Sequence, residues 1–314
     1  MKKNKTLILG GTGFIGLNLI DRICKSGGKV RVLCRPSYSL GRLEPYRNQM
    51  ELIIGDFLDD SLLRKCVEGV DKVYHLITTT FPSTTQDSAV YDINTNLVPT
   101  IRLVEECLKG KVKTLVYASS GGTIYGEQGS KGISESTDLN PISLYGQTKG
   151  AIESYLRFYS RVTSLNVKIL RISNPYGPQQ KPFGVQGLVA TVIQCLLQNK
   201  ELSVYGDMKT VRDYIYIEDV IEALVRISES KGPDVVNISS GEGRSILEVI
   251  KIIEKVSKRK VLLKKIPKRV QDVKSNILNP ELAWKSYHWK ANVDFEEGIR
   301  KTWNWYLKSA PSLR

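Results

Sequence analysis

The sequence predicts an α/β protein, in which a doubly wound parallel sheet is followed by a smaller mixed α/β C-terminal lobe. Two observations lead to this prediction. Short apolar segments of strand length alternate with helical patterns through about residue 172, as repeated strand–helix–strand units do. From residue 174 the pattern loosens, because prolines and glycines crowd the stretch 175–184 and mark a long loop.

The first strand leads into a glycine turn and then a helix. The apolar residues 7–9 precede a run of glycines, and an apolar helical pattern follows at once. A helix that begins after such a turn offers unpaired N–H groups and a partial positive charge to an anion. This context favours dinucleotide binding in a Rossmann-type fold. The residues expected to hold the dinucleotide here are Gly10, Gly13, Phe14, Ile15 and Gly16.

The remaining elements follow from the same two periodicities. Further strands are predicted at residues 30–33, 52–54, 73–77, 115–118 and 167–172. Helices are predicted at residues 60–68, 97–108, 145–163 and 187–199. We therefore expect residues 1–173 to form an NAD(P)-binding domain, to which residues near 211–238 return. Residues 174–314 are expected to form mainly a substrate-binding lobe.

The end of the second strand bears on the choice of cofactor. An acidic residue there binds the ribose 2′-hydroxyl of NAD, whereas a cation accommodates the 2′-phosphate of NADP. This chain has Arg35 and Ser37 at that place and no carboxylate before Glu44. NADP(H) is therefore the favoured cofactor, and NAD(H) stays possible. Asp56, just after the third strand, is expected to accept a hydrogen bond from the adenine amino group.

Two stretches carry groups suited to redox chemistry on a hydroxyl or carbonyl. Tyr145 and Lys149 are one helical turn apart on one face. A neighbouring cation and an oxidised nicotinamide are expected to lower the pKa of the tyrosine, so that it exchanges a proton while hydride moves. Lys149 is also expected to bind the nicotinamide ribose. Ser120 and Thr123 follow the fifth strand, where their hydroxyls can polarise a carbonyl.

Composition narrows the choice of partners. The chain has 46 basic and 32 acidic residues and a formal charge of +14, which suits polyanionic small molecules. The basic run at residues 251–269 is interpreted as a helix and strand with a solvated face, so neither nucleic acid nor a membrane is expected as a partner. Five scattered cysteines indicate a reducing cytoplasm. Only two histidines are present, and no metal site is expected.

Taken together, these motifs resemble those of the extended short-chain dehydrogenase/reductases, the family of sugar-nucleotide epimerases, dehydratases and reductases. The resemblance covers nearly the whole chain. It rests on the segments 10–16, 96–100, 170–178, 204–207, 211–219 and 296–302, besides the Tyr145–Lys149 pair. It implies an NAD(P) site in the first domain and a nucleoside-diphosphate sugar in the cleft beside it. Tyr145 and Lys149 would be the catalytic pair, while Asn174, Arg212 and Arg269 would contact the substrate. Family members commonly dimerise through two helices each, here those near 97–108 and 145–163.

The sequence departs from the family pattern in two places. The usual catalytic Ser or Thr falls on Gly121, so its hydroxyl must come from Ser120 or Thr123, of which we favour Thr123. Cys34 stands where NAD-binding members usually carry an acid.

Three functions remain open. A dehydratase is not one of them, because Gly121 and Gly122 occupy the place where dehydratases of the family carry their acid and base. We favour an NADPH-consuming 4-reductase of a nucleotide-4-keto-6-deoxysugar in surface polysaccharide synthesis. An NAD-dependent UDP-hexose 4-epimerase is the alternative. A non-catalytic dinucleotide sensor is the third, and the retained Tyr145 and Lys149 argue against it.

Overall fold

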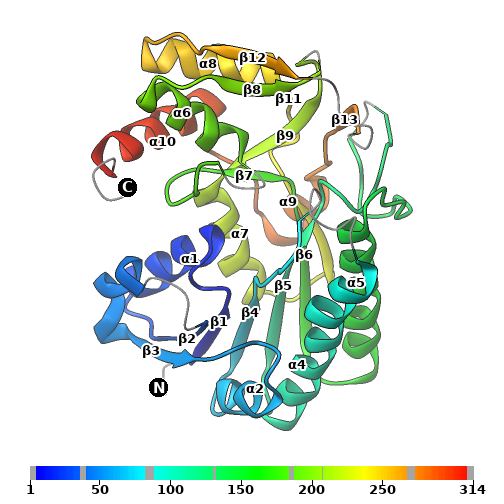
Figure 1. The fold of residues 1–314 in the computed structure, drawn as a ribbon. Helices are drawn as coiled ribbons and strands as arrows, with labels where there is room; N and C mark the ends of the chain where they lie inside the picture. Colours follow the sequence, from blue (N-terminus) through cyan, green and yellow to red (C-terminus); the bar gives the residue numbers. More distant parts are fainter. Residues whose placement is uncertain are drawn as a thin grey trace.

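The computed structural model describes residues 5–35, 40–81, 88–129, 132–183, 187–206, 208–266 and 273–309. Seven parallel strands form its central sheet (Figure 1). Their order, β10-β6-β5-β4-β1-β2-β3, winds in one direction from β1 to β3 and in the other from β4 to β10. This doubly wound order confirms the predicted fold class. The strands are β1 (Thr6–Leu9), β2 (Val30–Cys34), β3 (Met50–Ile54), β4 (Lys72–His75), β5 (Thr114–Ser120), β6 (Asn166–Ile172) and β10 (Val235–Ile238).

Helices cover both faces of this sheet. In Figure 1, α1 and α7 lie on one face, and α2, α4 and α5 lie on the other. Local sequence explains where two of them begin, because Asp59 caps the backbone N–H groups that start α2 and Ser143 caps those of α5. The helices are α1 (Phe14–Lys25), α2 (Asp60–Val67), α3 (Ala89–Asp92), α4 (Val98–Lys109), α5 (Leu144–Val162) and α7 (Ile217–Ser228), with 3-10 turns η1 (Leu40–Arg42) and η2 (Glu44–Gln49) and a π-helical turn η3 (Ile93–Leu97).

Two predicted boundaries were wrong. The fourth strand ends at His75 and not at residue 77. At the next residue, Leu76, the backbone packs closely against the glycine turn at Gly10, where the first strand has already ended. The helix expected from residue 97 is preceded by α3 and η3, so helical backbone begins at Ala89. Residues 92–96 are mostly polar and lack the apolar period of a surface helix, which is why the sequence did not indicate this part.

The later part of the chain builds two small sheets. β9 pairs antiparallel with β11 and parallel with β13 and β7, while β12 pairs with β8. The division into two domains at residue 173 stays a prediction. Two later elements, α7 and β10, lie within the residues 211–238 that were expected to return, and they pack on or join the first sheet. The elements are β7 (Asn174–Tyr176), α6 (Leu188–Gln198), β8 (Leu202–Tyr205), β9 (Val211–Tyr216), β11 (Gly243–Ser245), α8 (Ile246–Ser257), β12 (Leu263–Ile266), β13 (Ser275–Asn276), α9 (Glu281–Tyr287) and α10 (Phe295–Ser309).

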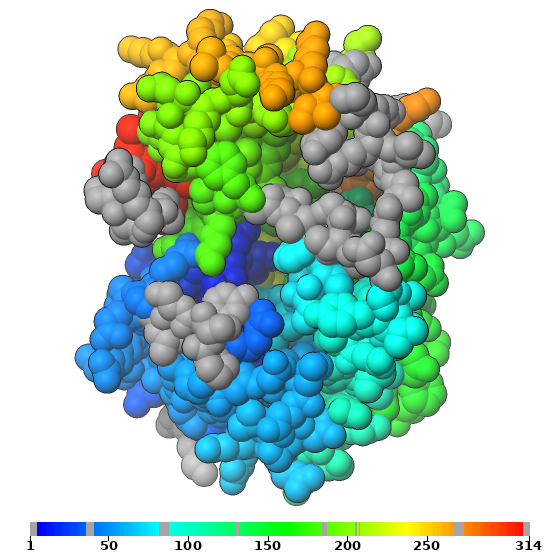
Figure 2. Space-filling model, viewed as in Figure 1, coloured from blue at the N-terminus to red at the C-terminus, as the bar shows by residue number. Residues whose placement is uncertain are grey.

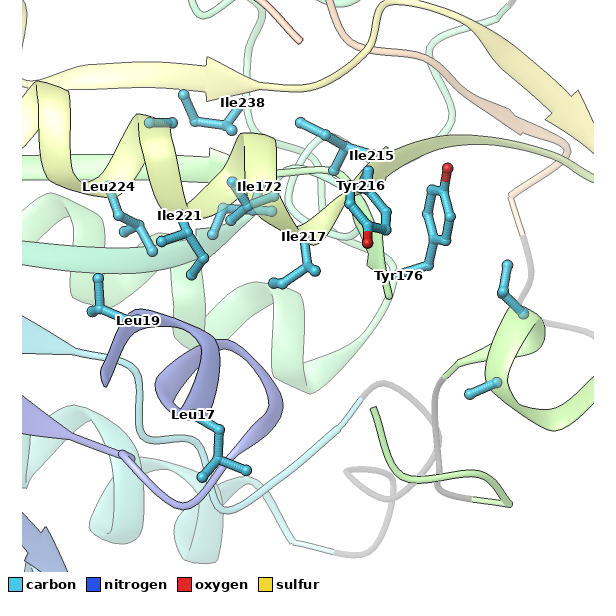
Figure 3. Close-up of a cluster of buried hydrophobic side chains, with 14 of the residues drawn as sticks. Leu17, Leu19, Ile172, Tyr176, Ile215, Tyr216, Ile217, Ile221, Leu224 and Ile238 are labelled. Atoms are coloured by element: carbon cyan, nitrogen blue, oxygen red, sulfur yellow. The ribbon is translucent and has the colours of Figure 1, made fainter. Parts of the chain in front are cut away.

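The hydrophobic core is continuous between the two parts. Figure 3 shows Leu19 of α1 near Ile221 and Leu224 of α7. Leu17 of α1 and Tyr176 of β7 belong to the same cluster. A second cluster fills the opposite face of the sheet, under α2, α4 and α5. The first cluster contains residues of both parts, and it therefore packs the second lobe against the sheet. No helix in the described ranges combines the length and apolarity needed to cross a membrane.

A buried ion pair fixes α5 against the sheet. The Arg171 guanidinium on β6 donates to the Glu153 carboxylate on α5 at 2.7 and 3.0 Å, and both side chains are almost fully buried. Arg171 also donates to the Tyr125 hydroxyl at 2.8 Å, and Ser119 of β5 donates to Glu153. Because Glu153 lies one turn beyond Lys149, this network sets the position of the helix face that carries the candidate reacting groups.

We predict that Arg171→Met lowers the free energy of unfolding by about 3–5 kcal/mol, because Glu153 is left buried without its cation. Urea denaturation measures the change. The double variant Glu153→Gln/Arg171→Met removes both charges and is expected to regain most of the loss. A double variant less stable than Arg171→Met alone would contradict this account.

Candidate active site

A cleft of about 1390 Å³ opens at the carboxyl edge of the parallel sheet. It lies where the chain turns from β1 on one side and from β4 on the other, the position at which doubly wound sheets bind ligands. Residues of the second lobe, among them Asn174 and Arg212, form its other wall. Figure 2 shows the hollow between the blue and cyan N-terminal part and the green and orange C-terminal part.

The glycine turn after β1 brings backbone close to this cleft. Gly10 has a φ of +87°, which glycine adopts without steric cost. A Cβ on Gly16 would lie 2.2 Å from the Gly10 carbonyl oxygen, so only glycine lets α1 begin so near the turn. Gly10, Gly13, Phe14, Ile15 and Gly16 all line the cleft. This cradle fits a dinucleotide pyrophosphate, which would meet the N-terminus of α1.

The end of β2 also reaches the cleft. Arg35 and Cys34 line it, and burial raises the pKa of the Cys34 thiol, so Cys34 supplies no negative charge. Asp56 lines the cleft after β3 and accepts a hydrogen bond from the Leu58 N–H at 3.0 Å. The predicted contact at Ser37 lies outside the described residues.

Tyr145 and Lys149 lie together in the cleft wall, as their spacing predicts. Both are buried, with 8% and 6% of their surface exposed. The Lys149 ammonium donates to the Ala118 carbonyl at 3.0 Å. It also lies 4.5 Å from the centre of the Tyr117 ring and 5.7 Å from that of Tyr145. The carbonyl and the Tyr117 ring therefore hold the amine at the end of β5.

Burial governs the charge states of this pair. It raises the pKa of Tyr145 to about 12, against a smaller lowering by a hydrogen bond with Ser120. In the protein alone the pKa of Tyr145 therefore lies above its ordinary value. The lowering expected from a neighbouring cation together with an oxidised nicotinamide stays a prediction. Burial likewise lowers the pKa of Lys149 to about 8, while Glu153 and Asp92 raise it. At neutral pH Tyr145 is a proton donor and Lys149 is a cation.

Ser120 is the hydroxyl residue at the end of β5 that the structure pairs with Tyr145. Ser120 ends β5 and hydrogen-bonds the Tyr145 side chain. The Thr123 hydroxyl instead points to the Ser120 carbonyl at 3.5 Å, although both residues line the cleft. A Cβ on Gly121 would lie 2.3 Å from the end of the Leu278 side chain, so any larger residue at this position would require Leu278 to move. The structure thus pairs Ser120 with Tyr145, and the preference for Thr123 as the catalytic hydroxyl stays a prediction.

Asp92 is a buried carboxylate that the sequence analysis did not single out. It accepts hydrogen bonds from Thr80 at 2.6 Å, Asn96 at 2.7 Å and Thr148 at 2.8 Å. Thr148 is the neighbour of Lys149, so Asp92 fixes α5 from a second side. The signal was present, because Asp92 and Asn96 stand at i and i+4 immediately before a helical pattern.

The second lobe contributes polar groups opposite this pair. The Asn174 amide donates to the Asp213 carbonyl at 3.1 Å, and Arg212 donates to the carbonyls of Val211 and Val273. The neighbouring Asp213 carboxylate accepts from Ser240, Gly241 and Leu278 and is fully buried. Asp213 is thus engaged behind the cleft wall, while Arg212 lines the cleft. The predicted contact of Arg269 lies outside the described residues.

Comparison with known proteins identifies the family. The model of the NAD dependent epimerase/dehydratase family matches residues 6–239. The chain belongs to this family. The match confirms the resemblance, seen in the sequence, to sugar-nucleotide enzymes of the extended short-chain dehydrogenase/reductase family.

Members with different reactions resemble the chain equally well. A UDP-glucose 4-epimerase of Mycolicibacterium smegmatis is 31% identical over 305 residues, which cover 95% of this chain and 97% of the relative. A dTDP-4-dehydro-6-deoxyglucose reductase of Escherichia coli is 30% identical over 311 residues, or 96% of each chain. The crystal structure of a Thermotoga maritima UDP-glucose 4-epimerase with UDP-glucose has a TM-score of 0.90 at 30% identity, with 98% of this chain and 99% of that one covered. The family is thus an enzyme family acting on nucleotide sugars, and overall similarity does not separate its reactions.

The charge on Lys149 predicts a pH dependence of cofactor binding. Because the pKa of Lys149 is about 8, the ammonium is lost as the pH rises through 8, and we expect the affinity for NADPH to fall over that range. Asp92→Asn removes a charge that raises this pKa, so the fall is expected at lower pH. Fluorescence titration of NADPH between pH 6 and 10 measures both.

Lys149→Gln is expected to abolish the dependence. As a matched control, Asp60→Asn removes a surface carboxylate that pairs with Arg102, and we expect it to leave the curve unchanged. Identical curves for Asp92→Asn and the unsubstituted protein would count against a role of Asp92.

Proposed function

We propose that the protein is an NADPH-dependent 4-reductase of a nucleoside-diphosphate 4-keto-6-deoxyhexose. The observation that carries this proposal is Arg35 at the cleft edge after β2, in place of the acid that favours NAD. A cation there suits the 2′-phosphate of NADPH, the cofactor that a net reduction consumes. The Escherichia coli relative with reductase activity supports the same choice.

In this proposal Tyr145, Ser120 and Lys149 carry out the proton transfer and hold the cofactor. The buried Tyr145, with its pKa near 12, donates a proton to the C4 oxygen, and Ser120 hydrogen-bonds the same oxygen. Lys149 binds the nicotinamide ribose through its ammonium and stabilises the tyrosinate that remains. When bound, the reduced nicotinamide supplies the hydride.

The diphosphate of the substrate fits the second lobe. We propose that Arg212 binds it through its guanidinium and that Asn174 hydrogen-bonds it. From the family resemblance, Arg269 is proposed to contact the nucleotide. A reducing cytoplasm is the proposed location, because Cys24, Cys34, Cys66, Cys107 and Cys195 are free and buried.

A UDP-hexose 4-epimerase is the second candidate, because UDP-glucose 4-epimerases are among the similar relatives and solved structures. It would use the same Tyr145 and Lys149, with NAD kept bound. The purified protein distinguishes the two. Stoichiometric loss of NADPH with a 4-keto-6-deoxy sugar nucleotide supports the reductase, whereas retained NAD and interconversion of UDP-glucose with UDP-galactose would contradict it.

We predict that Tyr145→Phe lowers turnover at least a hundredfold, since it removes the proton donor, while NADPH still binds. Steady-state kinetics and fluorescence titration measure the two quantities. Tyr159→Phe, a change of the same kind further along α5, is the control and is expected to retain activity. Full turnover by Tyr145→Phe, or no turnover by any form of the protein, would refute the mechanism; the latter would favour a dinucleotide sensor.

We predict that Arg35→Asp reverses the cofactor preference. The affinity for NADPH is expected to fall by about tenfold or more, because a charge-assisted contact with the 2′-phosphate is replaced by repulsion. The affinity for NADH is expected to rise. Arg47→Asp makes the same charge change at an exposed site on η2 and serves as the control. An unchanged ratio in Arg35→Asp would oppose the NADPH assignment.

We further propose a homodimer that forms through α4 and α5. Tyr155, Phe158 and Val162 leave 48%, 48% and 59% of their surface exposed, on one face of α5. The family resemblance supports the same pair of helices, which lie side by side on the outside of the sheet in Figure 1. An apolar stripe of this kind is typical of a protein interface.

Phe158→Glu is therefore predicted to yield monomers in light scattering after size-exclusion chromatography, because it buries a charge in the interface. Leu307→Glu changes a similarly exposed apolar residue on α10 and is expected to leave the mass unchanged. A monomeric unsubstituted protein would contradict the proposal.

A further inference from the structure

The end of the second lobe carries a concentrated positive charge. Residues 251–269 contain nine lysines and arginines and one acidic residue, Glu254, a net +8 out of the +14 of the whole chain. The described part of this segment forms the end of α8 and the strand β12. In Figures 1 and 2 these elements lie at the top of the molecule, away from the sheet and beyond the cleft.

Most of this charge is exposed and not neutralised. An open hollow at the end of α8 is lined by Glu254 and five cations: Lys251, Lys255, Lys258, Arg259 and Lys260. Lys255 pairs with Glu296 and Lys260 with Glu254. Among the described residues, no carboxylate lies within ion-pair distance of Lys251, Lys258, Lys264 or Lys265.

Exposed leucines lie among these cations. Leu262 and Leu263 leave 55% and 40% of their surface exposed, immediately before Lys264 and Lys265 on β12. Among the described strands, β12 pairs with β8 alone, so no described strand occupies its other edge. Leucines beside lysines are suited to the interface of a lipid bilayer, where the apolar side chains enter between headgroups and the cations meet anionic phosphates.

We propose that this basic face, defined by α8 from Lys251 onward and by β12, binds peripherally to the surface of an anionic phospholipid bilayer. It revises the expectation that no membrane partner is involved. The inference does not depend on the proposed reaction. In Figure 1, α5 and β9 lie below α8 and β12. These two elements carry the cleft residues Tyr145 and Arg212, so a bilayer on α8 and β12 leaves the cleft away from the contact.

Nucleic acid is the other polyanion that such a face suggests, and two observations favour lipid. The exposed large aromatic side chains of the described residues are Tyr91, Tyr155, Phe158, Phe183 and Trp284, none of which belongs to α8 or β12. Single-stranded nucleic acids are usually held by bases stacked on aromatic side chains. The exposed apolar groups of this face are aliphatic, which suits acyl chains.

Vesicle sedimentation tests the proposal. The protein is mixed with vesicles of phosphatidylcholine alone or with phosphatidylglycerol added, at low and high salt. We expect binding only to the anionic vesicles, and binding that weakens with salt. The variant with four unpaired lysines changed to Gln is expected to bind on the order of a thousandfold more weakly. The four positions are Lys251, Lys258, Lys264 and Lys265.

A control with the same net charge separates a local face from general basicity. It carries Gln at four exposed lysines elsewhere: Lys65, Lys111, Lys285 and Lys290. This control is expected to bind anionic vesicles nearly as well as the unsubstituted protein. Leu262→Ser/Leu263→Ser is expected to weaken binding while its salt dependence persists.

Three results would overturn the proposal. The first is equal binding by the two four-lysine variants, which would assign the effect to total charge. The second is an absence of binding to anionic vesicles at low salt. The third is tight binding of an RNA or DNA oligonucleotide to the basic face without vesicle binding. Thermal unfolding of both variants checks that the fold is intact, independently of which cofactor the protein binds and which reaction it catalyses.

Discussion

The position of α5 is the constraint on which the candidate active site depends. Two buried carboxylates hold this helix, Glu153 through Arg171 on β6 and Asp92 through Thr148. They act on either side of Lys149 and keep Tyr145 and Lys149 at the end of β5. A buried carboxylate has a high desolvation cost unless donors satisfy it, so each of these contacts specifies one arrangement of the helix.

The same burial decides the protonation states. Tyr145 and Lys149 are adjacent, yet the phenol does not become a phenolate, because removing both groups from water disfavours both charged forms. The tyrosine is thereby kept as an acid and the lysine titrates close to physiological pH. Negative charge at Glu153 and Asp92 partly offsets the desolvation of Lys149. The two carboxylates therefore hold the helix and also tune the amine.

Much of this was predictable from sequence, for reasons that differ among residues. The strand, glycine turn and helix around Gly10 and Gly16 follow from local periodicity and from a close approach that only glycine permits. The spacing of Tyr145 and Lys149 places both on one helix face whatever the tertiary structure. Ser120 and Thr123, by contrast, differ only in their tertiary contacts, since Ser120 hydrogen-bonds Tyr145 whereas the Thr123 hydroxyl points to the Ser120 carbonyl. Asp92 was missed because its partners Thr80 and Thr148 are remote in sequence.

The central claim is that Tyr145 delivers a proton to the C4 oxygen of a nucleotide sugar that faces a nicotinamide held by the opening glycines. A crystal structure with NADP and a nucleoside-diphosphate hexose tests it most directly. The account predicts the Tyr145 Oη within hydrogen-bond distance of the C4 oxygen, Lys149 on the nicotinamide ribose and Arg212 on the diphosphate. A structure with both ligands bound and the Tyr145 hydroxyl directed away from the C4 oxygen would contradict it.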